Sequence, residues 1–381
     1  MVAPESPDRF DWAWTDSRLQ HLQSVGLQAI GGLLHHGSGP SYTNLIDPQF
    51  AQKFARYAGA IARRYPWLEH YTPVNEPLTT ARFSALYGHW YPHARDEKAF
   101  VSAFLAQCRA VVLGMRAIRA VNSSALLVQT EDLGCTSSTP HLRYQADFEN
   151  ERRWLTWDLL RGVIDRNHPM WSYFKWAGVD DEQLMFFADN PCPADIIGIN
   201  YYVTSERFLD ENLEWYPPET HGGNGRESYA DDAAVRARSD GIEGVYPRLI
   251  EAWQRYGTSM ALTEVHLGCT LDEQLRWFME MWRCAVRALN DGCDVRAFTS
   301  WALLGSFDWD ALVTRQSGTY EPGAFDVRGD APRATAIAAA IQQLSRGESV
   351  YHPALDSVGW WHRPSRLRRP CQLTGTGTVL S

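Results

Sequence analysis

One short run, ended by a carboxylate and a proline, constrains the fold more than any other part of this chain. Residues 71–74 read Tyr-Thr-Pro-Val and lead into Asn75 and Glu76, and Pro77 follows. Because proline cannot donate to a strand ladder and biases the preceding residue toward an extended backbone, the pattern is typical of a strand with a carboxylate at its C-terminal tip. Parallel strands of (β/α) barrels carry catalytic groups at those tips. An ordinary exposed glutamate at a strand end fits this motif equally well.

A second carboxylate in the same kind of position favours the functional interpretation. Residues 259–263 form another apolar run, and this run ends on Glu264. Glycoside hydrolysis requires two carboxyl groups, one as acid/base and one as nucleophile. Glu76 and Glu264, on two strand tips of one barrel, would supply that pair.

The whole chain alternates between short apolar runs and helical patterns. Six strand-like runs lie near residues 28, 71, 126, 196, 260 and 296, which predicts an α/β fold with a parallel sheet. The 381 residues, 45% of them hydrophobic, suffice for a single (β/α) barrel domain, although a closed barrel has eight strands. We expect this domain over residues 1–350. The composition then turns to Pro, Arg, Gly and Thr, which predicts a linker or tail over residues 351–381.

Charge, hydropathy and cysteine content exclude several other classes. A net charge of −9 without a long basic run argues against nucleic acid as the partner. No apolar run approaches the ~20 residues of a membrane span, and the N-terminal residues do not resemble a secretory signal. The seven cysteines are odd in number and form no C-x-x-C pair, which predicts free thiols and a cytoplasmic location.

Two further polar pairs end apolar runs. His35 and His36 follow the run at 27–34, and a pair of histidines at one strand tip favours a role in a site. Glu131 and Asp132 follow the run at 125–130, where a supporting role and ordinary loop charges both remain open.

Four motifs, in order along the chain, together resemble glycoside hydrolase family 1, the β-glucosidase and β-galactosidase family. The similarity extends from about Phe10 to Arg333, and within the family it is greatest to the branch fused to a dTDP-4-dehydrorhamnose-reductase-like domain. The motifs are the Asn-Glu-Pro signature within Thr72–Pro77, the strand Ile197–Tyr202, the pair Thr263-Glu264, and the tryptophan segment Trp301–Trp309.

The resemblance implies a retaining mechanism and a role for eight side chains. Glu76 would be the general acid/base and Glu264 the nucleophile, with Tyr202 orienting Glu264. The residues expected to contact the sugar are His35 at the glycone, Asn75 at the 2-hydroxyl, Trp301 beneath the ring, and Asp308 and Trp309 at the outer hydroxyls. The family's chemistry needs no metal and no organic cofactor, and its partner is a small carbohydrate.

The chain also departs from the family pattern. The usual T-E-N-G segment is replaced by Thr263–His266, and Asp308 stands where the family has a glycone-binding glutamate. The family's first two β/α units, with a glycone-binding glutamine, have no counterpart, so we expect an incomplete barrel of about six strands. Open sheet edges invite pairing with another chain, which predicts a homo-oligomer. Residues Cys371–Thr378 resemble the opening strand and phosphate turn of a reductase domain, which suggests a fragment of a two-domain protein.

Three functions remain open at this point. The leading hypothesis is a retaining, exo-acting β-glycosidase that hydrolyses terminal β-linked sugars. A catalytically silent carbohydrate-binding or scaffold barrel would keep the fold without turnover. A barrel glycosidase of different specificity, cleaving chitobiose or aryl glycosides or transferring sugars, would keep the two carboxylates.

Overall fold

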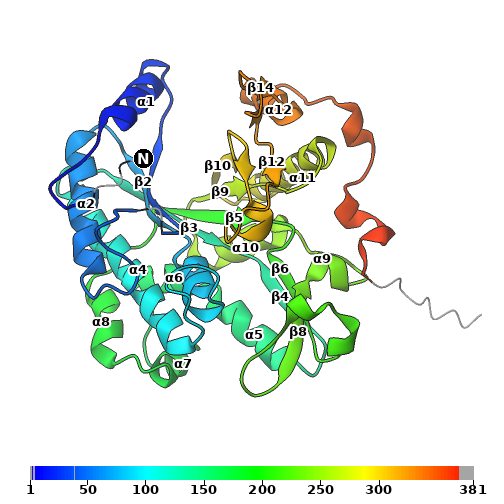
Figure 1. Cartoon of the computed structure of the whole chain (residues 1–381), viewed down its shortest axis with the longest axis horizontal. Helices are drawn as coiled ribbons and strands as arrows, with labels where there is room; N and C mark the ends of the chain where they lie inside the picture. Colours follow the sequence, from blue (N-terminus) through cyan, green and yellow to red (C-terminus); the bar gives the residue numbers. More distant parts are fainter. Residues whose placement is uncertain (1, 3–4, 38, 369–381) are drawn as a thin grey trace, which may run out of the picture.

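The computed structural model describes residues 2, 5–37 and 39–368 (Figure 1). Its centre is a parallel sheet in the order β1-β2-β3-β5-β9-β10, which is the order along the chain. The strands are β1 Ile30–His35, β2 His70–Asn75, β3 Leu126–Asp132, β5 Ile196–Tyr201, β9 Met260–Val265 and β10 Val295–Ser300. Sequential parallel strands with helical crossovers form a (β/α) barrel, here with six strands, which confirms the predicted fold class.

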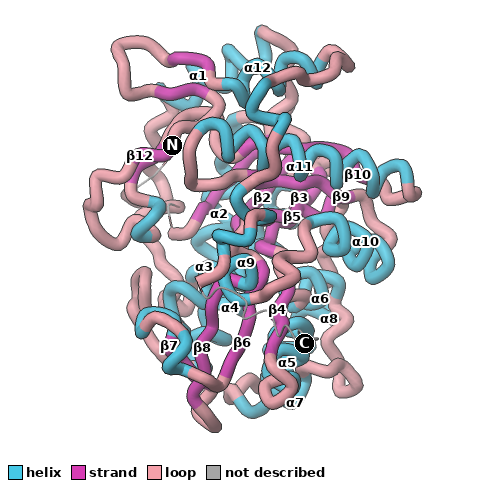
Figure 2. Tube along the Cα trace, turned by 90° about the vertical axis from the view of Figure 1, so that its right-hand side faces the viewer, coloured by secondary structure: helices cyan, strands magenta, loops and turns pink. Residues whose placement is uncertain are grey.

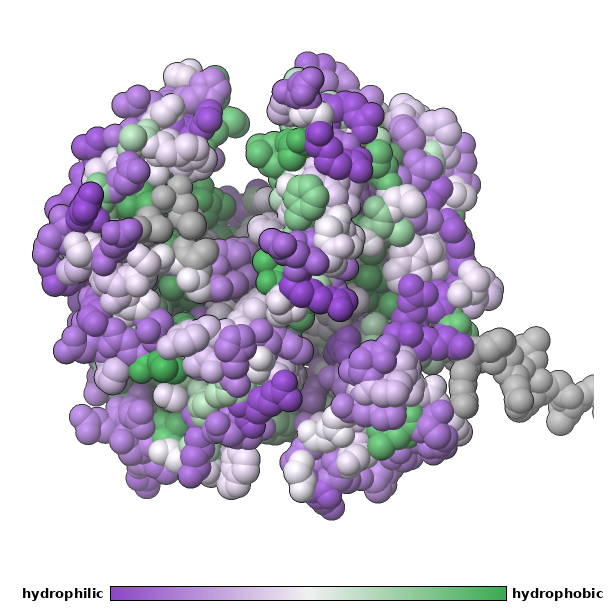
Figure 3. Space-filling model, viewed as in Figure 1, coloured by the Kyte–Doolittle hydropathy of each residue, from purple (hydrophilic) through white to green (hydrophobic). Residues whose placement is uncertain are grey.

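The barrel is open between its first and last strands. Within the described part of the chain, β1 and β10 each pair on one side only. Strands of a closed parallel barrel are buried on both faces, yet in β10 the residues Arg296, Ala297 and Thr299 are exposed. The space-filling view shows the molecule hollowed between the α1–β1 side and the β10–α12 side (Figure 3).

Helices surround this sheet, and a few of them pack on strands outside it. They are α1 Ala13–Ser24, α2 Phe50–Arg64, α3 Pro77–Ala81, α4 Glu97–Arg119, α5 Arg143–Arg152, α6 Leu155–Arg161, α7 Trp171–Trp176, α8 Asp181–Asp189, α9 Ala234–Ala237, α10 Val245–Tyr256, α11 Leu271–Asn290 and α12 Ala336–Ser345. Helix α4 begins at Asp96, whose side chain accepts from the Ala99 N–H at 2.9 Å. Of the described helices, it alone is long and apolar enough to cross a membrane, but two thirds of its most apolar stretch is buried. Because it packs between α2 and β2, we interpret α4 as a core helix.

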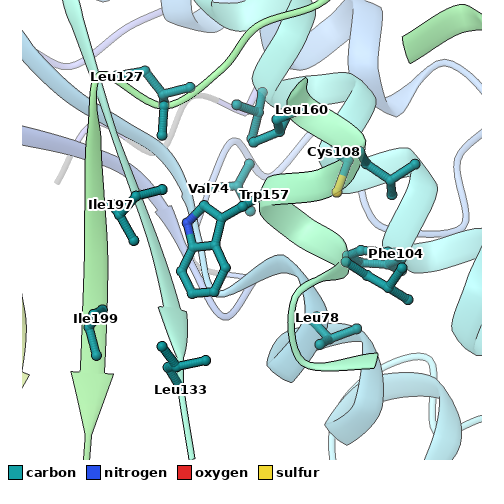
Figure 4. Packing of buried hydrophobic residues seen from close by; sticks show 14 of the residues in the cluster. Val74, Leu78, Phe104, Cys108, Leu127, Leu133, Trp157, Leu160, Ile197 and Ile199 are labelled. Carbon is teal, nitrogen blue, oxygen red and sulfur yellow. The ribbon is translucent and has the colours of Figure 1, made fainter. Parts of the chain in front are cut away.

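Trp157 of α6 joins the helical layer to the strands. Its ring lies between Ile197 of β5 on one side and Phe104 and Cys108 of α4 on the other (Figure 4). The indole N–H donates to the Gln129 carbonyl at 3.0 Å, so this large, fully buried side chain leaves no polar atom unpaired. The tight contact fixes α6 against the middle of the barrel.

A second sheet lies beyond the tips of β3 and β5 (Figure 2). Its strands, in the order β4-β6-β8-β7, are β4 Cys135–Ser138, β6 Glu206–Asp210, β8 Ser228–Ala233 and β7 His221–Gly223. Three of these strands lie within residues 203–245, a polar, glycine-containing stretch whose sequence has no clear periodicity. Two pairings of two-residue strands follow β10, namely β11 Ser306–Phe307 with β12 Tyr320–Glu321, and β13 Phe325–Asp326 with β14 Arg333–Ala334.

The described part of the segment after residue 350 packs against the barrel. It forms 3-10 turns at Pro353–Asp356, Trp360–His362 and Pro364–Arg366. Trp361 is fully buried, and its ring meets that of Trp277 of α11 edge-on at 5.0 Å. The domain boundary at residue 350 therefore stays a prediction, and Cys371–Thr378, the reductase-like stretch, lies outside the described residues.

Candidate active site

The tips of adjacent strands bring the predicted residues to one edge of the sheet. Asn75 ends β2 and pairs in register with His35 of β1. Two strands away, Asn200 of β5 pairs in register with Glu264 of β9. Because all these strands run parallel, their C-terminal ends gather Glu76 and Glu264 at the same mouth of the barrel.

Glu76 occupies an unusual backbone position. Its φ of 46° and ψ of 64° place it in the left-handed region, and Pro77 then opens α3. Non-glycine residues in this region store strain that is concentrated at functional sites. The side chain is buried, and its Oε1 accepts a 2.7 Å hydrogen bond from Asn200 Nδ2. The sharp turn thus directs the carboxyl group into the barrel mouth.

Among the described residues, no arginine or lysine lies within 4.0 Å of the Glu76 carboxyl group. His36 Nε2 lies 3.7 Å from Glu76 Oε2, but burial and the neighbouring His35 lower the pKa of His36 to about 3, so this imidazole is neutral. Burial raises the pKa of Glu76 well above its ordinary value, and the charges of Glu264, Asp132 and Glu131 raise it further. These effects favour the protonated form of Glu76, which is the form that a general acid needs.

Glu264 is buried too, but it is better solvated by hydrogen bonds. The Tyr202 hydroxyl donates to Glu264 Oε2, which is the contact predicted for Tyr202. Burial and the charge of Asp132 raise the pKa of Glu264, whereas the polar side chains of Tyr202, Asn200 and Asn75 lower it. The balance is a pKa of about 7. The pair thus shares one proton near neutrality, with Glu264 the first to ionise.

The two carboxyl groups share a pocket of about 250 Å³. One wall is aromatic: the rings of His35 and Trp301 stack at 5.2 Å and 6°, and Trp309 meets Trp301 edge-on at 6.2 Å. Such flat, C–H-accepting faces suit the apolar side of a sugar ring. The pocket is therefore sugar-sized, with aromatic, carboxyl and hydroxyl groups converging on it.

Asn75 lies deeper than predicted. It is buried and does not line the pocket surface. Its Oδ1 accepts from Thr130 Oγ1 at 2.7 Å, and its Nδ2 has no hydrogen-bond acceptor among the described residues. Because the amide lowers the pKa of Glu264, it faces that carboxyl group and leaves a donor available beside it.

The structure does not support the predicted sugar contact of Asp308. Its Oδ1 accepts from the N–H groups of Ser317 and Gly318, at 3.1 and 2.7 Å, and from the Ser317 hydroxyl at 3.0 Å. These bonds turn the carboxyl group into its own loop, so it does not line the pocket. Glu321 of β12 lines it instead, and its Oε2 lies 2.7 Å from His266 Nε2.

Sequence reasoning missed Glu321, and it left the role of Asp132 open. The pairing of β11 with β12 places Glu321 at the pocket, and no local sequence pattern predicts this pairing. Glu131 is buried and Asp132 half-buried, both within β3 rather than in a loop, and Glu131 accepts from the N–H groups of Leu78 and Thr79 at the start of α3. His266 could have been suspected, because it lies two residues beyond Glu264.

In the described ranges, no group of three or more His, Cys, Asp and Glu side chains is placed to hold a metal ion.

Comparisons with known proteins agree with this geometry. No protein-family model matches the chain. A β-galactosidase of Saccharolobus solfataricus is 23% identical over 295 residues, covering 74% of this chain and 56% of that protein. β-Glucosidase 4 of Oryza sativa subsp. japonica is 23% identical over 346 residues, covering 80% and 70%. The solved family 1 glycoside hydrolase of Thermotoga maritima, complexed with a cyclophellitol analogue, superposes with a TM-score of 0.72 over 89% of this chain and 78% of that one, at 14% identity.

The fold is that of the family 1 glycoside hydrolases. The six sequential parallel strands of this chain are consistent with part of such a barrel. At 14% identity, the superposition shows similarity of fold and nothing about activity. The chain spans little more than half the length of the Saccharolobus protein, at 56%. The similarity alone therefore does not show that this chain has β-galactosidase activity.

Proposed function

We propose that this chain is a retaining, exo-acting β-glycosidase of the β-glucosidase and β-galactosidase type. The observation that carries the proposal is the buried pair Glu76 and Glu264, which shares one sugar-sized pocket with an aromatic wall. The names of the relatives, β-galactosidase and β-glucosidase, point to the same substrate class.

In the first step, the Glu264 carboxylate attacks the anomeric carbon of a β-glycoside. The bond from that carbon to the leaving oxygen breaks as Glu76 gives its proton to this oxygen, and a covalent glycosyl ester forms on Glu264. Ionised Glu264 is held by the Tyr202 hydroxyl, and burial keeps Glu76 protonated beside it.

In the second step, water replaces the ester. Esterified Glu264 carries no charge, so one of the groups that raise the pKa of Glu76 is gone and Glu76 can act as base. It takes a proton from water, the water oxygen bonds to the anomeric carbon, and the Glu264 carboxylate leaves. Two inversions release a sugar of retained configuration.

A panel of aryl β-glycosides tests the assignment. Glu264→Gln should abolish turnover of every substrate. Glu76→Gln should abolish turnover of phenyl glycosides but spare part of the reaction with 2,4-dinitrophenyl glycosides, whose leaving group needs no proton. Glu182→Gln, at an exposed position of helix α8, is the matched control.

The other outcomes are informative as well. Sugar binding by a wild-type protein that turns nothing over would favour the silent carbohydrate-binding barrel. Cleavage restricted to chitobiose or aryl glycosides would favour the glycosidase of different specificity. Activity that survives both glutamate substitutions would mean that other carboxyl groups do the chemistry.

We also propose that the chain forms a homo-oligomer that covers the open barrel edges. Among the described strands, β1 and β10 each have one unpaired edge, and this observation and the exposure of Ile30, at 46%, support the proposal. Light scattering coupled to size-exclusion chromatography should show a dimer or larger species, and a clean monomer at micromolar concentration would refute it.

Two further proposals rest on the sequence. The motifs in 72–77 and 301–309 favour the branch fused to a reductase-like domain. The six described cysteines are free, which favours a cytoplasmic location that fractionation of the source cells would test.

A further inference from the structure

A second hollow adjoins the active-site pocket. It has a volume of about 310 Å³ and lies where the tips of β3 and β5 meet the second sheet. Phe83, Asp132, Thr204 and Leu312 line both hollows, so the two share a wall. A volume near 300 Å³ is at the lower end of known ligand pockets and fits one sugar unit or one substituted aromatic ring.

Four arginines line this second hollow, which we call the arginine pocket: Arg82, Arg152, Arg153 and Arg207. Two of them have fixed partners, because Arg153 pairs with Glu251 at 2.9 Å and Arg207 with Asp231 at 2.7 Å. Within residues 5–368, apart from residue 38, no carboxylate lies within 4.0 Å of the guanidinium of Arg82 or Arg152. Two guanidinium groups of the pocket thus lack an ion-pair partner.

Arg152 is the more deeply placed of these two. Only 5% of its surface is exposed, and its guanidinium lies over the rings of Phe148 and Phe100 at 5.4 and 5.8 Å. Burial lowers the pKa of Arg152, but Glu149, Tyr87 and other neighbours raise it more, so the group stays charged. A buried charge without a close counter-ion is costly, and an anionic ligand would relieve that cost.

Arg82 also has unused hydrogen-bonding capacity. Its Nε is buried without a partner among the described residues, and its Nη2 makes one 3.3 Å bond, to Thr79 Oγ1. Guanidinium groups bind carboxylates through two parallel N–H donors, a geometry that water or a hydroxyl does not match.

Two of the three acidic groups that line the pocket already have partners. Asp231 is paired with Arg207, and Glu149 accepts from Thr136 Oγ1 and Gln145 Nε2 at 3.1 and 3.0 Å. Burial raises the pKa of the third, Asp132, whereas the hydrogen bond from Ser205 and the charges of Arg82 and Arg207 lower it, and its buried Oδ1 has no hydrogen-bond partner among the described residues. The pocket therefore offers more free N–H donors than free acceptors.

Chain direction places the arginine pocket on the leaving-group side. Arg82 and Phe83 begin the π-helical turn Arg82–Leu86, which follows the proton donor Glu76 through α3. The aromatic wall and Glu321 come from the other side of the active-site pocket, from β1 and from the loops beyond β10. Since the leaving oxygen departs beside Glu76, the group attached to it extends toward Arg82.

We propose that the arginine pocket binds the leaving group of the substrate and that this group is a ring bearing a carboxylate, such as a uronic acid or an aromatic acid. The inference rests on the proposed glycosidase function and adds the substrate class on the leaving-group side. Arg82 and Arg152 would hold the carboxylate.

A matched substrate pair tests this directly. With the preferred sugar fixed, 4-carboxyphenyl and 4-(methoxycarbonyl)phenyl β-glycosides differ in one charge. The ester is the better leaving group, so a preference for the acid cannot come from reactivity. We expect kcat/KM to favour the acid by about 10-fold or more in the wild type, mainly through KM, and this ratio to collapse in Arg82→Gln and Arg152→Gln. Arg116→Gln, on the outer part of α4, should keep the ratio.

A binding measurement separates this inference from the proposed function. Calorimetric titration with 4-hydroxybenzoate, with its methyl ester as the neutral comparison, needs no turnover. If no glycoside is cleaved but the acid binds and Arg82→Gln weakens it by about 10-fold, the proposed function fails and the arginine pocket stands. If glycosides are cleaved with no preference for the acid, or with a preference that Arg82→Gln leaves intact, the inference is overturned and the glycosidase remains. Absence of both cleavage and Arg82-dependent binding would remove both.

Discussion

At the scale of single residues, one amide connects both carboxyl groups of the site. Asn200 Oδ1 accepts from Thr263 Oγ1 at 2.6 Å, which fixes the amide so that Nδ2 donates to Glu76. The same amide lowers the pKa of Glu264. Ionising both acidic groups in one buried pocket is energetically costly, so these contacts determine which carboxyl group holds the shared proton.

Asp132 should set the pH range of activity. Its charge raises the pKa of both Glu76 and Glu264, so Asp132→Asn should lower both values. The acid limb of kcat/KM reports ionisation of Glu264 and the alkaline limb reports loss of the Glu76 proton. We therefore expect both limbs of the bell-shaped profile to move to lower pH.

Asp210→Asn is the control for this experiment, because Asp210 is buried on β6 but lines neither pocket. Limbs that stay in place, or that move to higher pH in Asp132→Asn, would show that Asp132 does not act on the pair through its charge.

Glu321, rather than Asp308, should contact the sugar. Loss of a charged hydrogen-bond acceptor in Glu321→Gln should lower kcat/KM by about 10-fold to 100-fold. Asp308→Asn keeps the Oδ1 acceptor that holds Ser317 and Gly318, so its kcat/KM should stay within about 3-fold of the wild type. The reverse order of effects in steady-state kinetics on the same glycoside would restore the sequence-based assignment.

The residues that could be predicted are those at the ends of apolar runs. Glu76 and Glu264 end runs whose pattern fixes both the strand and the direction of its tip. Asp308 follows no such run, and its place in the sequence could not reveal that Ser317 and Gly318 bind it first. Glu321 depends on a pairing of residues after β10 that sequence patterns do not encode.

At the scale of elements, the strands pack closely in the middle of the barrel and loosely at its edge. A Cβ added at Gly198 of β5 would lie 2.8 Å from Thr130 Cγ2 and 3.0 Å from Thr263 Oγ1, between two neighbouring strands. A Cβ added at Gly32 of β1 would meet nothing within 4 Å. Gly198 thus allows the backbones that carry Asn200 and Glu264 to approach.

The two glycines make a matched pair for a stability test. Gly198→Ala should lower the free energy of unfolding by about 1–3 kcal/mol through overpacking. Gly32→Ala should leave it unchanged or raise it by about 0.4–1 kcal/mol, since alanine reduces the freedom of the unfolded chain. Thermal or urea unfolding compares them, and equal effects at the two sites would contradict the packing described for β5.

Element boundaries show where local patterns fail. The apolar spacing of residues 10–26 is typical of a helix, and the observed helix is Ala13–Ser24, in which Thr15 and Asp16 lie inside the first turns rather than at the cap. Asp16 instead forms an ion pair with Arg64 of α2, a contact between distant residues. The strands of the second sheet were missed for the same reason, because β4 pairs with β6, which lies some 70 residues further along the chain.

At the scale of the whole molecule, the open barrel is tied together at its mouth. Trp90, in the loop after β2, donates through Nε1 to the Leu312 carbonyl, in the loop after β10, at 2.8 Å. This bond joins segments 222 positions apart, and both residues line the active-site pocket. The number of strands could be predicted from the alternation in the sequence. The hydrogen bond across the gap could not be predicted, because it depends on contacts between loops.

Trapping the glycosyl ester tests the central claim most directly. With a 2,4-dinitrophenyl 2-deoxy-2-fluoro-β-glycoside, fluorine slows both steps while the activated leaving group restores the first, so the ester accumulates. Mass spectrometry should find one fluoroglycosyl group per chain, on the peptide that contains Glu264, and none on Glu264→Gln. A label on another carboxyl group, or hydrolysis with inversion and no label, would contradict the assignment of Glu264 as nucleophile and Glu76 as its acid/base partner.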